Sequence, residues 1–195
     1  KGHDVYVYNS SAHPYQEKVW NGVSIIHCKD PEGKIGTAGQ FIYDLNCILD
    51  SRKRDFDIIL QLGYTSSSVW NWLFSKKSVI ITNMDGLEWK RSKYSKLVQR
   101  FLLYAESLAV KYSDYLISDS VGIETYLKNK YSVDSKYIPY GANLISDMDH
   151  SILKENNLIT NSYNMLIARM QPENSIETIL QSVIKSDTKR KFLVI

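Results

Sequence analysis

The sequence has little of the residues that mark several specialised classes of protein. It holds two cysteines in 195 residues, which argues against a disulfide scaffold and predicts reduced thiols at Cys28 and Cys47, as in cytosolic proteins. Its four histidines are scattered, and none stands at ligand spacing from a cysteine, so we expect no metal site. No run of about 18 apolar residues occurs, which argues against a membrane-spanning helix.

Phosphate-binding signatures and a strong charge are absent as well. The sequence contains no GxGxxG element and no GxxxxGK element followed by Ser or Thr, which disfavours dinucleotide-dependent oxidoreductases and P-loop proteins. Its formal net charge of +3 is too small to indicate nucleic acid by itself.

Short apolar runs alternate with amphipathic segments along the chain. The runs predict strands at 5–8, 23–27, 58–61, 79–82, 115–118, 136–139, 165–168 and 192–195. Apolar residues at helical spacing predict helices over 38–49, 97–112 and 176–184. Most of the strands are apolar throughout, as in sheets covered on both faces. We therefore predict an α/β fold built on a Rossmann-like parallel sheet.

A polar stretch divides the chain into two parts. We expect a Rossmann-like domain over 1–143, a linker over 144–163 and the beginning of a second Rossmann-like domain over 164–195. The chain opens in a turn that leads directly into a strand and ends inside another strand, so we expect a fragment of a longer protein.

Polar segments follow the predicted strands. Ligands of open parallel sheets bind beyond the carboxyl ends of the strands, so we expect a binding crevice there. The segments that would line it are 61–68, 82–91, 118–122, 139–143 and 168–175.

The last of these segments suits a phosphate. Arg169 follows a predicted strand, and Asn174 precedes a helix with Glu177 three residues later, the pattern of an N-cap with a capping box. A helix N-terminus beside a guanidinium favours anions. In the alternative interpretation, Asn174 only caps the helix and Arg169 only pairs with a surface carboxylate.

The segment after the fourth predicted strand has two interpretations at each notable residue. Asp85 is placed to accept a hydrogen bond from a sugar hydroxyl or to act as a general base, but Asp85-Gly86 by itself is more typical of a plain turn. Trp89 suits stacking on a sugar ring and suits packing equally. After the fifth predicted strand, Asp119 precedes Ser120, which we expect to cap a helix.

Basic residues without an intervening acid follow Trp89. They are Lys90, Arg91, Lys93, Lys96 and Arg100. Three interpretations compete: a solvated helix face, contact with anionic lipid headgroups, and binding of a phosphate-bearing acceptor. Nucleic acid is the least favoured partner, because no nucleic-acid-binding motif accompanies the charge.

Three stretches carry a resemblance to a known family. They are "VIITNMDGLEWKRSKYSKLVQRFLLYAESLAVKYSDYLISDSVGIETYLKNKY", "YIPYGA" and "LIARMQPENSIE". The chain resembles the rhamnosyltransferase-type glycosyltransferases of bacterial capsule and surface-polysaccharide clusters. These are retaining, family 4-like enzymes of the two-domain GT-B fold, with a DUF1972-type N-terminal domain. The likeness spans the chain and is strongest over 82–126 and 167–177.

The resemblance implies a division of labour between the domains. The first domain would hold the acceptor and the second a nucleotide-sugar, with no metal or cofactor. It implies that the first strand and Gly-rich loop of the first domain are missing ahead of Gly2, and that the paired glutamates for the donor sugar lie after residue 195.

The resemblance also implies roles for single residues. On the donor side, Arg169 matches an Arg that contacts the diphosphate, Asn174 stands where many relatives carry a Lys for the same phosphates, and Gly141 and Asn143 match a hinge region lining the cleft. Asp85 stands where relatives place His-Asp or His-Gly near the reacting sugar, and no His is present here. The residues expected to line the acceptor side are Tyr64, Trp89, Arg91 and Asp119, with Lys90, Lys93, Lys96 and Arg100 facing the membrane.

These inferences predict a glycosyltransferase that moves a sugar, L-rhamnose from dTDP-L-rhamnose being the one favoured, onto a lipid-linked oligosaccharide at the cytoplasmic face of the membrane. The fragment alone is expected to be inactive. Two alternatives stay open: a non-catalytic module that binds a sugar or a partner protein, and a nucleotide-sugar epimerase of the GT-B shape.

Overall fold

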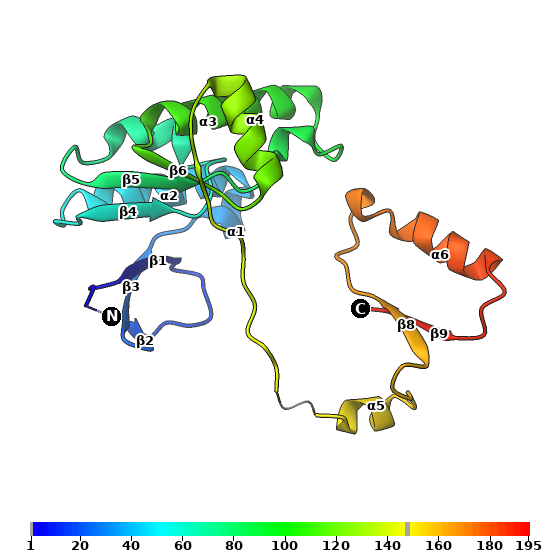
Figure 1. The fold of residues 1–195 in the computed structure, drawn as a ribbon. Helices are drawn as coiled ribbons and strands as arrows, with labels where there is room; N and C mark the ends of the chain where they lie inside the picture. Colours follow the sequence, from blue (N-terminus) through cyan, green and yellow to red (C-terminus); the bar gives the residue numbers. More distant parts are fainter. Residues whose placement is uncertain (1, 147–148) are drawn as a thin grey trace. The chain divides into compact units, whose positions relative to one another are not determined.

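Strands and helices alternate along most of the chain in the computed structural model, which describes residues 2–146 and 149–195 (Figure 1). The strands are β1 (Tyr6–Ser10), β2 (Val19–Trp20), β3 (Val23–Cys28), β4 (Ile58–Gln61), β5 (Val79–Asn83), β6 (Tyr115–Ser118), β7 (Lys136–Tyr137), β8 (Tyr163–Leu166) and β9 (Lys191–Val194). The α-helices are α1 (Glu32–Ile35), α2 (Ala38–Ser51), α3 (Lys96–Tyr112), α4 (Val121–Tyr131), α5 (Ser151–Glu155) and α6 (Ile176–Lys185). Short 3-10 helices are η1 (Ser68–Leu73), η2 (Glu88–Lys90) and η3 (Pro172–Asn174).

The chain forms two compact units. The first contains the chain up to Trp89 together with Lys96–Tyr140, and the second contains Lys90–Ser95 and Gly141–Ile195.

A four-stranded parallel sheet forms the centre of the first unit. Its strand order is β4-β5-β6-β7, and helices α3 and α4 lie on one side of it (Figure 1). The register pairs Gln61 with Thr82, Asn83 with Ile117 and Ser118 with Tyr137. This arrangement confirms the predicted α/β, Rossmann-like fold.

A separate three-stranded sheet in the same unit has the order β1-β3-β2. Strand β1 runs parallel to β3, whereas β2 runs antiparallel to it. The sequence pattern did not predict β2, because two residues are too few to show a strand period. It also did not predict that the strands of this unit would divide between two sheets.

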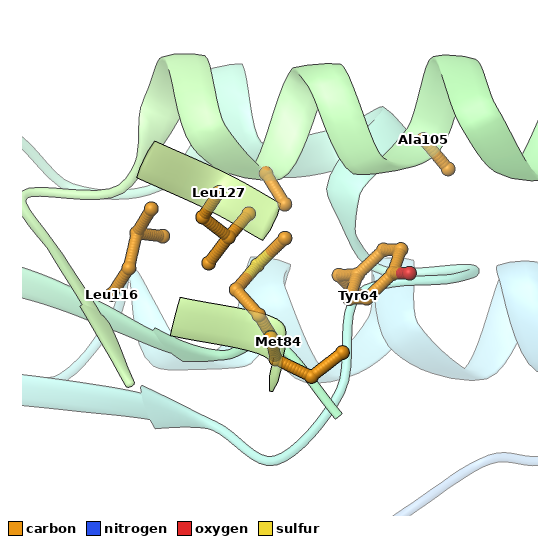
Figure 2. Packing of buried hydrophobic residues seen from close by; sticks show 7 residues of the cluster. Tyr64, Met84, Ala105, Leu116 and Leu127 are labelled. Atoms are coloured by element: carbon orange, nitrogen blue, oxygen red, sulfur yellow. The ribbon is translucent and has the colours of Figure 1, made fainter. Parts of the chain in front are cut away.

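Apolar side chains between the four-stranded sheet and its helices form the core (Figure 2). Ala105 and Ala109 lie one turn apart on α3 and are both 0% exposed, so small side chains bring this helix close to the sheet. The buried members of the cluster are Tyr64, Met84, Ala105, Ala109, Leu116, Ile123 and Leu127. Helix α4 begins as predicted: the Ser120 side chain accepts a hydrogen bond from the Ile123 amide at 3.3 Å.

The second unit contains a parallel pair of strands, β8 and β9, with α6 between them in sequence. The prediction that Asn174 caps this helix is wrong. Helix α6 begins at Ile176 after Ser175, whose φ of 49° is left-handed and whose side chain makes no capping bond. Pro172 starts the 3-10 turn η3, which ends at Asn174. The Asn174 side chain therefore bonds to the loop backbone instead, a common alternative for Asn.

Candidate functional site

The carboxyl ends of the four parallel strands bring polar side chains from distant parts of the sequence together. Gln61 ends β4, Asn83 ends β5, and Asp119 directly follows β6. The register of the sheet places these strand ends side by side. Tyr140, beyond β7, reaches the same edge, since its hydroxyl accepts a hydrogen bond from Asn83 Nδ2 at 3.3 Å. We define these four residues as the sheet-edge site.

Three oxygen atoms of the sheet-edge site are buried and have no hydrogen-bond partner among the described residues. They are Gln61 Oε1, Asn83 Oδ1 and Asp119 Oδ1. The Gln61 side chain is held in place because its Nε2 donates to Thr82 Oγ1 at 2.8 Å. Each buried acceptor without a partner costs about 1–3 kcal/mol. A ligand that presents several hydroxyl or N–H donors would satisfy these oxygens.

Asp85 lies in a turn whose two neighbouring residues, Met84 and Gly86, are held by hydrogen bonds. The preceding Met84 is 2% exposed, and its backbone amide donates to Ile117 O at 2.8 Å. The following Gly86 has a φ of 71°, a conformation that favours glycine, and its carbonyl accepts a hydrogen bond from the Tyr64 hydroxyl at 3.1 Å. The Asp85 side chain itself is exposed, and it stands two residues after Asn83 of the sheet-edge site.

Tyr64, expected on the acceptor side, supports this turn from the core. It is 3% exposed, and Figure 2 shows its ring among the buried side chains. Burial, and next the nearby Glu106 carboxylate, raise the pKa of the Tyr64 hydroxyl. The hydroxyl therefore stays a neutral donor to Gly86.

Trp89 is held by a buried carboxylate that the sequence did not reveal. Glu106 on α3 is 1% exposed, and its Oε2 accepts a hydrogen bond from Trp89 Nε1 at 3.1 Å. Its Oε1 accepts hydrogen bonds from the hydroxyls of Tyr126 and Tyr131, both at 2.7 Å, and from Lys130 Nζ at 2.9 Å. We call these five residues the Glu106 cluster.

Lys130 also makes cation–π contacts with the aromatic rings of the Glu106 cluster. Lys130 Nζ lies 4.8 to 5.2 Å from the ring centroids of Trp89, Tyr126 and Tyr131. Burial and then the hydrogen bond to Glu106 raise the pKa of both tyrosine hydroxyls. The cluster fixes the chain at Trp89, four residues after Asp85.

Basic residues follow Trp89 in the chain. Arg91 and Tyr94 form a tight turn, in which the Tyr94 amide donates to Arg91 O at 3.2 Å, and Lys93 Nζ lies 5.2 Å from the Tyr94 ring centroid. Lys90 ends η2. Lys96 and Arg100 are exposed residues of α3. Across the described ranges, no helix is long and apolar enough to cross a membrane.

The predicted donor-side residues belong to the second unit. Arg169 and Asn174 are brought together, because Asn174 Nδ2 donates to Arg169 O at 2.7 Å. Gly141 and Asn143 lie in an exposed segment without regular structure. The donor-binding role of these four residues stays a prediction.

Sequence reasoning placed Gln61 and Tyr140 in segments expected to line the crevice without singling them out, and it missed Glu106, Tyr126, Lys130 and Tyr131. Gln61 and Tyr140 carried a signal, since both stand at the ends of predicted strands. Glu106 is a lone acid within the apolar face of α3, which marks a buried carboxylate in retrospect. Lys130 carried no signal, because its charge partner Glu106 lies on another helix, 24 residues earlier in the chain.

The fold defines an α/β protein with a parallel sheet, and open sheets of this kind bind their ligands at the carboxyl ends of the strands. Residues 6–143 match the family described as "Domain of unknown function (DUF1972)". This match covers more than half of the chain, and the protein belongs to that family, whose domain occurs at the N-terminus of glycosyltransferase-like proteins. A search of curated proteins finds no match.

Proposed function

We propose that the protein is the acceptor-binding part of a glycosyltransferase that moves a sugar from a nucleotide-sugar to a lipid-linked glycan. Two observations support this function. The chain belongs to a family found in glycosyltransferase-like proteins, and the sheet-edge site holds three buried acceptor oxygens without partners in the described structure. The unpaired oxygens are the main support for this function, because a glycan presents many hydroxyl groups that can donate hydrogen bonds to them.

In this proposal the residues of the first unit bind and orient the acceptor. Asn83, Gln61 and Asp119 accept hydrogen bonds from its hydroxyls. Asp85, on the turn after β5, receives the proton of the attacking hydroxyl. The Glu106 cluster and Tyr64 act indirectly, because they hold the turn that carries Asp85.

The donor in this proposal is a nucleotide-sugar, with dTDP-L-rhamnose favoured by the family resemblance. Its diphosphate would lie near Arg169, whose guanidinium suits phosphate oxygens. The other donor-binding residues in this proposal are Gly141, Asn143 and Asn174.

A donor screen tests the proposed function. The protein from its complete gene is incubated with labelled UDP-, GDP- and dTDP-sugars and a lipid-linked acceptor, and label in the lipid product is measured. We expect transfer from one donor, and a loss of about tenfold or more for Asn83→Leu, since one hydrogen bond to the acceptor disappears. The control is Asn129→Leu on an exposed position of α4. Isomerisation of the donor without transfer would identify an epimerase, and binding without turnover would identify a sugar-binding module.

We further propose that the basic residues contact anionic lipid headgroups. Lys90, Arg91, Lys93, Lys96 and Arg100 would each contribute about 1 kcal/mol at a negative surface. Binding to liposomes of phosphatidylglycerol is expected to fall steeply when Lys90, Arg91, Lys93 and Lys96 are all changed to Glu, and to weaken with salt. Equal binding of both proteins at low salt would contradict a membrane role.

A further inference from the structure

Tyr140 presents an exposed aromatic ring at the sheet-edge site. It is 72% exposed, although its hydroxyl reaches Asn83, which is 8% exposed. A single exposed tyrosine is common on protein surfaces and has no meaning by itself. Tyr140 differs because it is bonded to a residue whose other side-chain atom, Asn83 Oδ1, is buried without a partner among the described residues.

Strand pairing and a proline place Tyr140 at the carboxyl edge of the four-stranded sheet. Strand β7 pairs with β6, and Ile138 continues the pairing, since its amide donates to Ser118 O at 2.9 Å. Pro139 has no amide hydrogen and therefore cannot extend the ladder. Tyr140 follows at once, at the edge that carries Asn83.

The hydroxyl of Tyr140 is the atom that holds the ring. It accepts a hydrogen bond from Asn83 Nδ2 at 3.3 Å. Across residues 2–146 and 149–195, the ring has no aromatic or cation–π partner. The tip of the side chain is thus bonded to the site, while most of its surface stays in contact with solvent.

This arrangement offers the two kinds of surface that match a pyranose. The edge of such a sugar ring carries hydroxyl donors, and its faces carry C–H groups. Gln61 Oε1, Asn83 Oδ1 and Asp119 Oδ1 are acceptors without partners in the described structure, and they suit the hydroxyls. The ring of Tyr140 suits the C–H groups, because these pack on the electron-rich face of an aromatic ring.

We propose that the Tyr140 ring is the platform on which one pyranose ring of the glycan acceptor stacks. This inference rests on the proposed function and adds the form of the acceptor: a six-membered sugar ring with several C–H groups on one face. An acyclic polyol has the same hydroxyls but no rigid C–H face, so the platform selects against it. Asn83 then has two tasks, since its Nδ2 orients the platform and its Oδ1 accepts from the sugar.

The opposite arrangement is a Tyr140 that blocks the site and competes with the acceptor for Asn83. A blocking side chain would cover Asn83 with its ring and become buried itself. The 72% exposure of Tyr140 favours the platform instead. The two arrangements also differ in the sign of their mutational effects, because removal of a competitor tightens binding.

Sugar binding by the isotope-labelled protein from its complete gene tests the platform. The probes are the methyl pyranosides of L-rhamnose, D-galactose and D-glucose, with glucitol as the acyclic control. Binding is followed through the side-chain amide signals of Asn83 and Gln61. We expect at least one pyranoside to bind and glucitol not to bind. The C–H protons of the bound sugar should shift upfield, because they lie over an aromatic ring. Equal binding of glucitol would overturn the platform.

Substitutions of Tyr140 separate its ring from its hydroxyl. Tyr140→Leu should weaken binding about tenfold and abolish the upfield shift, whereas Tyr140→Trp should stay within about threefold of the unchanged protein. Tyr140→Phe keeps the ring but loses its anchor, and should weaken binding about threefold. The matched control is Tyr115→Leu, because Tyr115 is 65% exposed and begins β6 at the opposite edge of the sheet. Its affinity should be unchanged.

The outcomes distinguish the platform from the proposed function. Equal affinity of Tyr140→Leu and the unchanged protein, or tighter binding by Tyr140→Phe, would overturn the platform and leave the glycan site in place. No response of Asn83 and Gln61 to any pyranoside would contradict the glycan site itself, and the platform with it. Urea midpoints of the Tyr140 variants should match that of the unchanged protein, since the side chain is exposed.

Discussion

At the scale of single residues, buried charge decides how firmly the candidate site is held. Glu106 is 1% exposed and accepts four hydrogen bonds, from Trp89, Tyr126, Tyr131 and Lys130. A carboxylate with this many partners is stable in the interior, whereas removal of its charge leaves Lys130 facing three rings with no anion. The sequence did not predict this cluster, because its members come from η2, α3 and α4 and meet only in the folded chain.

Glu106→Gln should lower the free energy of unfolding by about 3 kcal/mol, because it breaks a buried pair and removes charge-assisted hydrogen bonds. Urea unfolding followed by tryptophan fluorescence measures the change. The control, Glu17→Gln on an exposed loop, should stay within about 0.5 kcal/mol. Equal midpoints for the two variants would show that the cluster does not stabilise the protein.

The Asp50 carboxylate predicts a pH dependence. The hydrogen bond from Arg54, and also that from Tyr8, hold the pKa of Asp50 below its usual range, although burial opposes them. A lowered pKa in the folded state stabilises the protein above the unfolded value of about 3.9, and this stabilisation is lost as the pH falls through the folded pKa. Asp50→Asn should therefore lower the urea midpoint at pH 7, with the difference vanishing towards pH 2. Asp55→Asn, at a side chain that is 96% exposed, should show no such pH dependence. A gap for Asp50→Asn that persists unchanged at low pH would contradict the assignment.

At the scale of elements, local pattern predicted most of what the structure contains. Strands β4 and β6 have the predicted bounds and α3 is one residue longer, because continuous apolar runs and helical spacing are local properties. The cap at Ser120 was predicted, but the one at Asn174 was not correct, since a proline turn intervenes. Strand pairing was the part that local pattern did not determine. It depends on which edges meet in the folded chain.

The close contact between α1 and α2 predicts that replacing a helical glycine by alanine lowers the stability of the protein. A Cβ on Gly39 would lie 2.4 Å from the Cα and N of Glu32, so Gly39→Ala forces the two helices apart. We expect it to cost about 1–3 kcal/mol, although alanine is normally the better helix former. Gly33→Ala on α1 is the matched control, since its Cβ meets nothing within 4 Å, and it should be neutral or slightly stabilising. Both stabilities come from urea unfolding, and a stabilising Gly39→Ala would contradict the packing described here.

At the scale of the whole molecule, the chain comprises two units joined through an exposed segment. The segment from Gly141 to Ser146 has no regular structure, and Leu144 is 99% exposed. The sequence predicted a change of character here from composition alone. It did not predict which strand ends would line a site, apart from the general rule that they form the ligand edge of a parallel sheet.

Limited chymotrypsin digestion should therefore cut first after Tyr140 or Leu144, where exposed backbone without hydrogen bonds fits a protease. Mass spectrometry of the first fragments identifies the site. Leu144→Ala should slow cleavage at that position and leave cleavage elsewhere unchanged. A first cut within α3 or the four-stranded sheet would contradict the division into units.

The sheet-edge site is the proposed place where a glycan binds. The most direct measurement is a titration of the isotope-labelled protein with a short-chain lipid glycoside, observed through the side-chain amide signals of asparagine and glutamine. We expect the Asn83 and Gln61 signals to shift together and saturably, the signal of exposed Asn129 to stay unchanged, and Asn83→Leu to weaken binding about tenfold. Shifts confined to other residues, or equal affinity for Asn83→Leu and the unchanged protein, would contradict the proposed site.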